Sequence, residues 1–243
     1  MKILSIGNSF SEDAHAYLHK VAKERGEDLY TVDLAIGGCS LERHYKNISE
    51  NLKAYLISTN GSEWEKDLVT IEEIIKNDIF DVVTLQQVSG YSGIYENYQP
   101  YLNEIISYVR KYQPNARLYI HRTWAYEIDS THSDFPKYDC DQAKMYKAIC
   151  DTTDKIANEV GVDIILSGTV IQNLRERVPE FDYKNGKDSL CRDGFHLSNY
   201  GRYAAALTWF ATLTGKQVSP MNHEDFDIDT IAKICKVVND TVF

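Results

Sequence analysis

Cysteine is sparse in this chain and follows no pairing pattern. The 243 residues contain five cysteines, an odd number, with no Cys-x-x-Cys pair. Such spacing disfavours a disulfide framework or a zinc site, and it is typical of reduced thiols in a reducing compartment. The five are Cys39, Cys140, Cys150, Cys191 and Cys235.

Long apolar runs and basic clusters are also missing. No stretch approaches the roughly 18 consecutive apolar residues of a membrane helix. The apolar run before Gly7 is too short for a signal peptide. We therefore expect a cytoplasmic protein with no membrane partner, although a chain that has lost a leader would show the same pattern. The net charge of -10 and the absence of Lys/Arg clusters lead us to expect no nucleic-acid partner.

The residues that are present indicate a globular α/β domain. Hydrophobic residues make up 43% and charged residues 26% of the chain, with no low-complexity linker. Short apolar runs alternate with longer amphipathic ones, which is the pattern of βαβ units around a parallel sheet. We predict one domain, residues 1–243, with a central five-stranded parallel sheet and helices on both of its faces. A helical extension over 217–243 is expected to pack on this domain.

The expected elements follow from this alternation. Strands are predicted at 3–6, 30–36, 81–85, 117–121 and 162–166. Helices are predicted at about 11–25, 100–112, 141–160, 198–214 and 229–238. The segment from 39 to 60 is expected to be irregular and partly helical. The sequence does not indicate a role for residues 41–66.

Ligands of an open parallel sheet bind beyond the carboxyl ends of its strands. Four predicted strands end in polar or glycine-rich loops, which should therefore meet at one edge of the sheet. The loops begin with Gly7-Asn8-Ser9, Gly37-Gly38-Cys39-Ser40, Gln86-Gln87-Val88-Ser89-Gly90 and Arg122-Thr123-Trp124.

Ser9 is the first candidate in these loops. Serine is a good helix N-cap, and Ser9-Phe10-Ser11-Glu12 fits the capping-box pattern. A nucleophilic role requires a base within hydrogen-bond reach and a group that orients the base. His196 and Asp193, three positions apart before a predicted helix, have the required side chains. The alternative for His196 is a loop histidine in a local turn.

Gly37 and Gly38 suit either a tight turn or an oxyanion hole, since glycine lets backbone N–H groups face a ligand closely. No GxGxxG or Walker A pattern occurs, so no nucleotide cofactor is expected. His15 and His19 lack the glutamate of an HExxH motif and a third ligand, so no metal is expected. We expect the protein to need no cofactor.

Several motifs together resemble the SGNH, or GDSL-type, serine esterases. These are Gly7-Asn8-Ser9, Gly38 and Asp193-x-x-His196, with Asn8 in place of the Asp of GDS. The segments IGNSFSEDA, IGGCSLERH, DVVTLQQVSGYSG, HRTWAY, GTVIQNLR and RDGFHLSNYGRYAAALTWFATLTG are similar to a bacterial branch catalogued as a domain of unknown function. They extend from residue 1 to about residue 216.

The resemblance implies a flavodoxin-like three-layer fold and a triad of Ser9, His196 and Asp193. It also implies that the backbone N–H groups of Ser9 and Gly38 form an oxyanion hole. The sequence departs from the family at the GxND block, because Gly90 stands where the asparagine belongs. We predict that the Gln87 amide takes this role, with Gln86 and Ser89 as alternatives.

The substrate expected from these features is a small-molecule or glycan ester, with an acetyl group on a sugar as the first choice. Trp124, Tyr126 and Tyr91 are predicted to form an aromatic wall for a sugar ring, and Asn8 is grouped with them as a substrate-binding residue. One rival is a non-catalytic glycan-binding module that uses the same cleft. Another is a structural domain that binds a partner through its acidic surface. The oligomeric state does not follow from the sequence.

Overall fold

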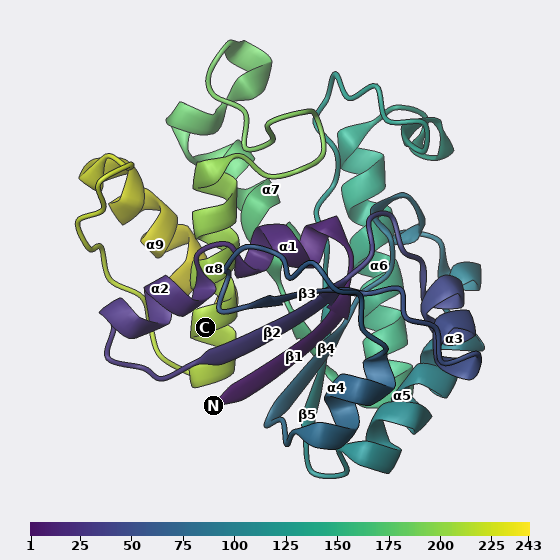
Figure 1. The fold of residues 1–243 in the computed structure, drawn as a ribbon. Helices are drawn as coiled ribbons and strands as arrows, with labels where there is room; N and C mark the ends of the chain where they lie inside the picture. Colours follow the sequence, from purple (N-terminus) through teal and green to yellow (C-terminus); the bar gives the residue numbers. More distant parts are fainter.

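The computed structural model describes all residues from 1 to 243 and has a six-stranded sheet at its centre (Figure 1). The strands are β1 (Lys2–Gly7), β2 (Tyr30–Ala35), β3 (Leu56–Thr59), β4 (Val82–Leu85), β5 (Arg117–His121) and β6 (Asp163–Ile165). Their spatial order is β3-β2-β1-β4-β5-β6. The predicted α/β class with helices around a central, mostly parallel sheet is confirmed.

The prediction of five strands was wrong by one edge strand. Strand β3 pairs antiparallel with β2, with Val32 opposite Thr59 and Ala35 opposite Leu56. It is only four residues long, and Leu56 is exposed. Two of its four residues, Ser58 and Thr59, are polar, so the strand lacks the continuous apolar run by which the other strands are predicted.

The helices cover both faces of the sheet. They are α1 (Ser9–His15), α2 (Leu18–Glu24), α3 (Leu41–Ser49), α4 (Ile71–Asn77), α5 (Tyr101–Tyr112), α6 (Gln142–Val160), α7 (Ser167–Arg177), α8 (Asn199–Thr214) and α9 (Ile228–Val242). The predicted helix at 11–25 is in fact two helices, with a break at Ala16 and Tyr17. The sequence analysis did not predict α4 or α7.

Two apolar clusters separate the layers. One lies between the sheet face that carries Ile3 and Val82 and the helices that cover it, which are α1, α2, α7, α8 and α9. The other joins α3, α4 and α5 to the face that carries Leu4 and Val83. Neighbouring strand residues belong to different clusters because successive side chains of a strand point to opposite faces.

The C-terminal helix α9 contacts α7 and α8, and Ile231, Ile234 and Val238 are buried there. None of the helices combines the length and the apolar character that crossing a membrane requires.

Candidate active site

The candidate site forms where β1 ends and α1 begins, at the carboxyl edge of the sheet (Figure 1). Asn8 caps α1, since its Oδ1 accepts a hydrogen bond from the Phe10 N–H at 3.1 Å. Ser9 is the first residue of the helix and is partly exposed. The capping role considered for Ser9 therefore falls to Asn8, and the Ser9 hydroxyl is left for another partner.

Ser9, His196 and Asp193 form one hydrogen-bonded line. The Ser9 Oγ lies 2.8 Å from His196 Nε2, and His196 Nδ1 lies 2.7 Å from Asp193 Oδ2. A carboxylate at Nδ1 holds the imidazole in the tautomer whose Nε2 can accept a proton. This arrangement can activate a serine hydroxyl for attack on a carbonyl carbon.

The Asp193 carboxylate is held in its charged form. Partial burial alone would raise its pKa, but hydrogen bonds from the His196 ring and from the backbone N–H groups of His196 and Phe195 outweigh it and lower the pKa. Those two N–H groups donate to Oδ1 at 2.8 and 3.2 Å. The second carboxylate oxygen, Oδ2, thus remains for the imidazole.

A buried carboxylate on α1 anchors the loop that carries His196. Asp13 is fully buried, and its Oδ2 accepts the Leu197 N–H at 2.7 Å. Its Oδ1 accepts from Arg192 at 2.8 Å and from Arg202 at 2.7 Å. Two guanidinium groups offset the cost of burying this charge. Since Asp13 lies four residues after Ser9, the helix that begins at Ser9 and the loop that carries His196 are tied to each other.

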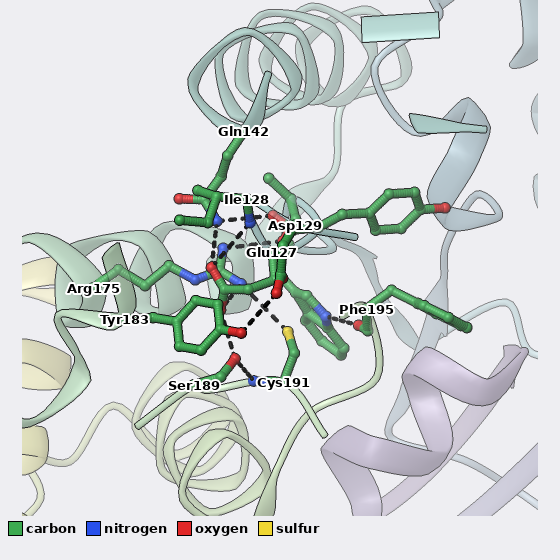
Figure 2. A network of polar contacts seen from close by, with 12 residues as sticks. Glu127, Ile128, Asp129, Gln142, Arg175, Tyr183, Ser189, Cys191 and Phe195 are labelled. Carbon is green, nitrogen blue, oxygen red and sulfur yellow. Dashed lines mark hydrogen bonds and ion pairs between the residues drawn. The ribbon is translucent and has the colours of Figure 1, made fainter. Parts of the chain in front are cut away.

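A second network supports the same loop from the other side (Figure 2). The Glu127 N–H donates to the Gly194 carbonyl at 2.7 Å, and Trp124 Nε1 donates to the Phe195 carbonyl at 2.7 Å. The buried Glu127 carboxylate accepts from Ser189 at 2.6 Å and lies 3.5 Å from Arg175. The backbone between Asp193 and His196 is therefore fixed to the loop after β5.

Backbone donors for an oxyanion are available at two places. The Ser9 N–H has no acceptor within its own helix, because the first N–H groups of a helix have none. Gly38 has a φ of +63° and is exposed, in a turn tied to α1 by a hydrogen bond from Asn8 Nδ2 to the Cys39 carbonyl at 3.1 Å. The positive φ is a backbone conformation that glycine adopts readily.

Gln87 is held by backbone contacts on its amide, and its role in the oxyanion hole stays a prediction. Its Oε1 accepts from the Leu41 and Val88 N–H groups, and its Nε2 donates to the Asn97 carbonyl. These contacts use one of the two N–H donors of the Gln87 amide nitrogen, and the second N–H has no partner within the chain. Gln86 is committed to Asn8 and His121, and Ser89 to Tyr126.

The predicted substrate-binding set is also largely internal. Trp124 and Tyr126 are fully buried, and Asn8 is 1% exposed. Trp124 stacks on Phe10, with ring centroids 4.2 Å apart. These three residues support the site from within, which corrects their assignment to its wall. Tyr91 is partly exposed and has the Lys137 ammonium over its ring.

Two aromatic rings that the sequence analysis did not select lie beside the triad. Phe195 contacts His196, with ring centroids 4.3 Å apart, and His132 contacts Phe195 at 4.7 Å. Both are partly exposed. Phe195 could have been found from its place between Asp193 and His196, whereas His132 lies in a long loop and has no local signal.

Asp134 fills the space at Gly90, the position of the missing asparagine. A Cβ atom at Gly90 would overlap the Asp134 carboxylate and its Cβ. The backbone N–H of Asp134 donates to His132 Nδ1 at 3.1 Å, which fixes this loop near the site. The Asp134 carboxylate is also paired with the Lys137 ammonium, so the loop after β5 packs directly against Gly90.

Comparisons with known proteins place the chain in a family. The model of a domain of unknown function, DUF4886, matches residues 2–241. A DUF4886 family protein from Bacteroides uniformis is 38% identical, with 100% of this chain and 94% of that chain covered and a TM-score of 0.91. The search of curated proteins gives no match.

More distant solved structures share the fold. A candidate SGNH hydrolase from Slackia heliotrinireducens is 19% identical, covering 88% of this chain and 98% of that one with a TM-score of 0.57. A catalytic mutant of an acetylxylan esterase from Geobacillus stearothermophilus is 12% identical, covering 86% and 92% with a TM-score of 0.54. The chain therefore belongs to the DUF4886 family and has the fold of the SGNH hydrolases.

Proposed function

We propose that this protein is a serine esterase that removes a small acyl group, in particular an acetyl group from a carbohydrate. The observation that carries the proposal is the line from Ser9 Oγ through His196 to Asp193, with contacts of 2.8 and 2.7 Å. The buried anchors at Asp13 and Glu127 support it, because they hold this line in place from both sides.

The chemistry follows from these positions. His196 Nε2 takes the Ser9 proton while Oγ attacks the ester carbonyl, and the N–H groups of Ser9 and Gly38 receive the oxyanion. His196 then gives the proton to the departing sugar hydroxyl. Water, deprotonated by His196, attacks the acyl-enzyme and releases the acid. Asp193 stays ionised and stabilises the imidazolium.

The surroundings favour a short acyl group. Phe10 contacts His196 and is stacked on the buried Trp124, so the protein has no space for a long acyl chain on this side of His196. Phe195 and His132 offer partly exposed rings on which a sugar can lie. The fold shared with an acetylxylan esterase is consistent with this choice.

The test compares hydrolysis of 4-nitrophenyl acetate, 4-nitrophenyl octanoate and acetylated xylan. Wild type should cleave the acetate and release acetate from xylan while turning over the octanoate poorly. Ser9→Ala should lose nearly all turnover, at least about a thousandfold. Ser49→Ala, which changes an exposed serine on α3, is the matched control. Equal activity in wild type and Ser9→Ala would refute the proposal.

The rival function is a glycan-binding module without turnover. It is favoured by the third block, where Gly90 stands at the position of the amide donor that the resemblance implies and has no side-chain donor. A hydrolase without that donor loses part of its oxyanion stabilisation. The rival predicts acetylated-glycan binding with no acetate released, whereas the esterase releases acetate.

A further inference from the structure

A cavity lies on the flank of α1, and its lining does not include Ser9, Asp193 or His196. It has a volume of about 330 Å³ and opens between the α1–α2 junction, the β2–β3 edge and α8. Glu12, His15, Asp33, Ser58, Trp64 and Arg202 are among its lining residues. The volume is within the range of small-molecule sites.

Two buried polar atoms of the cavity lining have no partner in the protein. Asp33 Oδ1 accepts from Ser11 Oγ at 2.8 Å, but Oδ2 is buried and unpaired. His15 Nε2 lies 2.7 Å from Ser5 Oγ, but Nδ1 is buried and unpaired. The side chains of Asp33 and His15 are 1% and 2% exposed. Unpaired polar atoms in so deep a wall are unusual, so a bound group that pairs with both would be favoured.

The inner wall is uncharged at neutral pH. Burial raises the pKa of Asp33 to about 8, so this carboxyl group keeps its proton. Burial lowers the pKa of His15 to about 3, so the imidazole is neutral. A carboxylic acid and a neutral imidazole can each donate or accept one hydrogen bond. They match a ligand group that does both, which is the property of a hydroxyl group.

The mouth of the cavity carries an aromatic ring and two charged side chains that suit the rest of such a ligand. Trp64 is partly exposed there and presents an apolar ring face. Glu12 and Arg202, both partly exposed, add an acceptor and a donor of opposite charge. Arg202 uses its Nε on Asp13, and its terminal nitrogens have no hydrogen bond within the chain.

We propose that this cavity binds a neutral sugar residue, at a site separate from Ser9. The sugar hydroxyls pair with Asp33 and His15 inside and with Glu12 and Arg202 at the mouth. The apolar face of the ring lies on Trp64. Binding here does not depend on ester cleavage, so the proposal stands or fails separately from the proposed function.

The test is a titration followed by ¹H–¹⁵N NMR, with D-glucose, D-galactose, D-xylose and L-arabinose as probes at millimolar concentrations. Trp124 and Trp209 are fully buried, so the Trp64 indole N–H gives a distinct reporter, assigned by its loss in Trp64→Ala. We expect at least one of these sugars to shift both this signal and the Asp33 backbone N–H. Glucuronate and glucosamine, which carry charges, should bind more weakly than their neutral parent.

Variants locate the site. Trp64→Ala and Glu12→Ala should each raise the dissociation constant at least about tenfold. Glu63→Gln changes an exposed neighbour that does not line the cavity and should leave binding unchanged, as should Ser9→Ala. The proposal is wrong if none of the four sugars shifts these signals, which would mean that the cavity holds water alone. It is also wrong if Trp64→Ala and Glu12→Ala bind as well as wild type.

Discussion

Gly90 and Asp134 show how a position can be constrained by a residue from a distant part of the chain. Glycine is required at position 90 because the Asp134 side chain occupies the space of any Cβ atom there. Asp134 comes from the loop after β5, about forty positions along the chain. A motif scan along the sequence finds the glycine but not its cause, because the two residues are neighbours only in the folded chain.

At the same scale, Asp33 should make the stability of the fold depend on pH. Its folded pKa, raised by burial to about 8, lies above its unfolded value of 3.8. Between these values the unfolded chain releases the proton and the folded chain keeps it. The folded state therefore loses stability as the pH rises through this window, and below about pH 4 the effect vanishes.

Asp33→Asn removes this titration and should make the protein more stable than wild type near neutral pH. The expected gain is ~1–3 kcal/mol at about pH 7.5, reduced because the new amide N–H₂ faces the cavity. Urea unfolding of both proteins at about pH 5 and about pH 7.5 measures it. The difference should grow with pH, and a difference that is equal at both values would contradict the assigned pKa.

At the scale of elements, α1 and the loop before α8 act as one unit through Asp13. Its carboxylate joins the helix that begins at Ser9 to the Leu197 N–H, next to His196. Without this carboxylate, the positive charges of Arg192 and Arg202, which contact its other oxygen, would lose their anionic partner. A shift of about 1 Å between reacting groups can cost on the order of a hundredfold in rate.

Asp13→Asn should therefore lower kcat about ten- to a hundredfold while KM changes little, and it should also lower the free energy of unfolding by ~3 kcal/mol. Initial rates on 4-nitrophenyl acetate and urea unfolding give the two values. Asp151→Asn, in an exposed ion pair on α6, is the control and should change neither. A loss of stability with kcat unchanged would show that Asp13 is structural only.

The elements also show which parts of the fold the sequence can predict. The five long or strongly apolar strands were predicted, since buried parallel strands have continuous runs of Val, Ile and Leu. Strand β3 was missed because half of its residues are polar, whereas the even shorter edge strand β6 lies in an apolar run. The break between α1 and α2 was missed because His15-Ala16-Tyr17 contains neither glycine nor proline. The position of the break follows instead from the separate packing of α1 and α2 on α8.

The site could be predicted in part for a similar reason. Ser9 follows a strand, and Asp193 and His196 are close in sequence, so the topology alone brings them to one edge. Whether Trp124 and Gln87 point into the site or into the core depends on what packs against them. Trp124 meets Phe10, and Gln87 meets backbone groups of three segments. Contacts between residues far apart in the chain cannot be predicted from the local sequence.

At the scale of the whole molecule, one covalent reaction tests the central claim, which is that Ser9 is the nucleophile. A fluorophosphonate reacts when an activated serine Oγ attacks phosphorus and fluoride leaves, and the mass of the intact protein then rises by one phosphonyl group. We predict one adduct per chain, located on Ser9 by peptide mapping and absent in His196→Ala. No adduct on the folded wild-type protein, or an adduct on a different serine, would contradict the account.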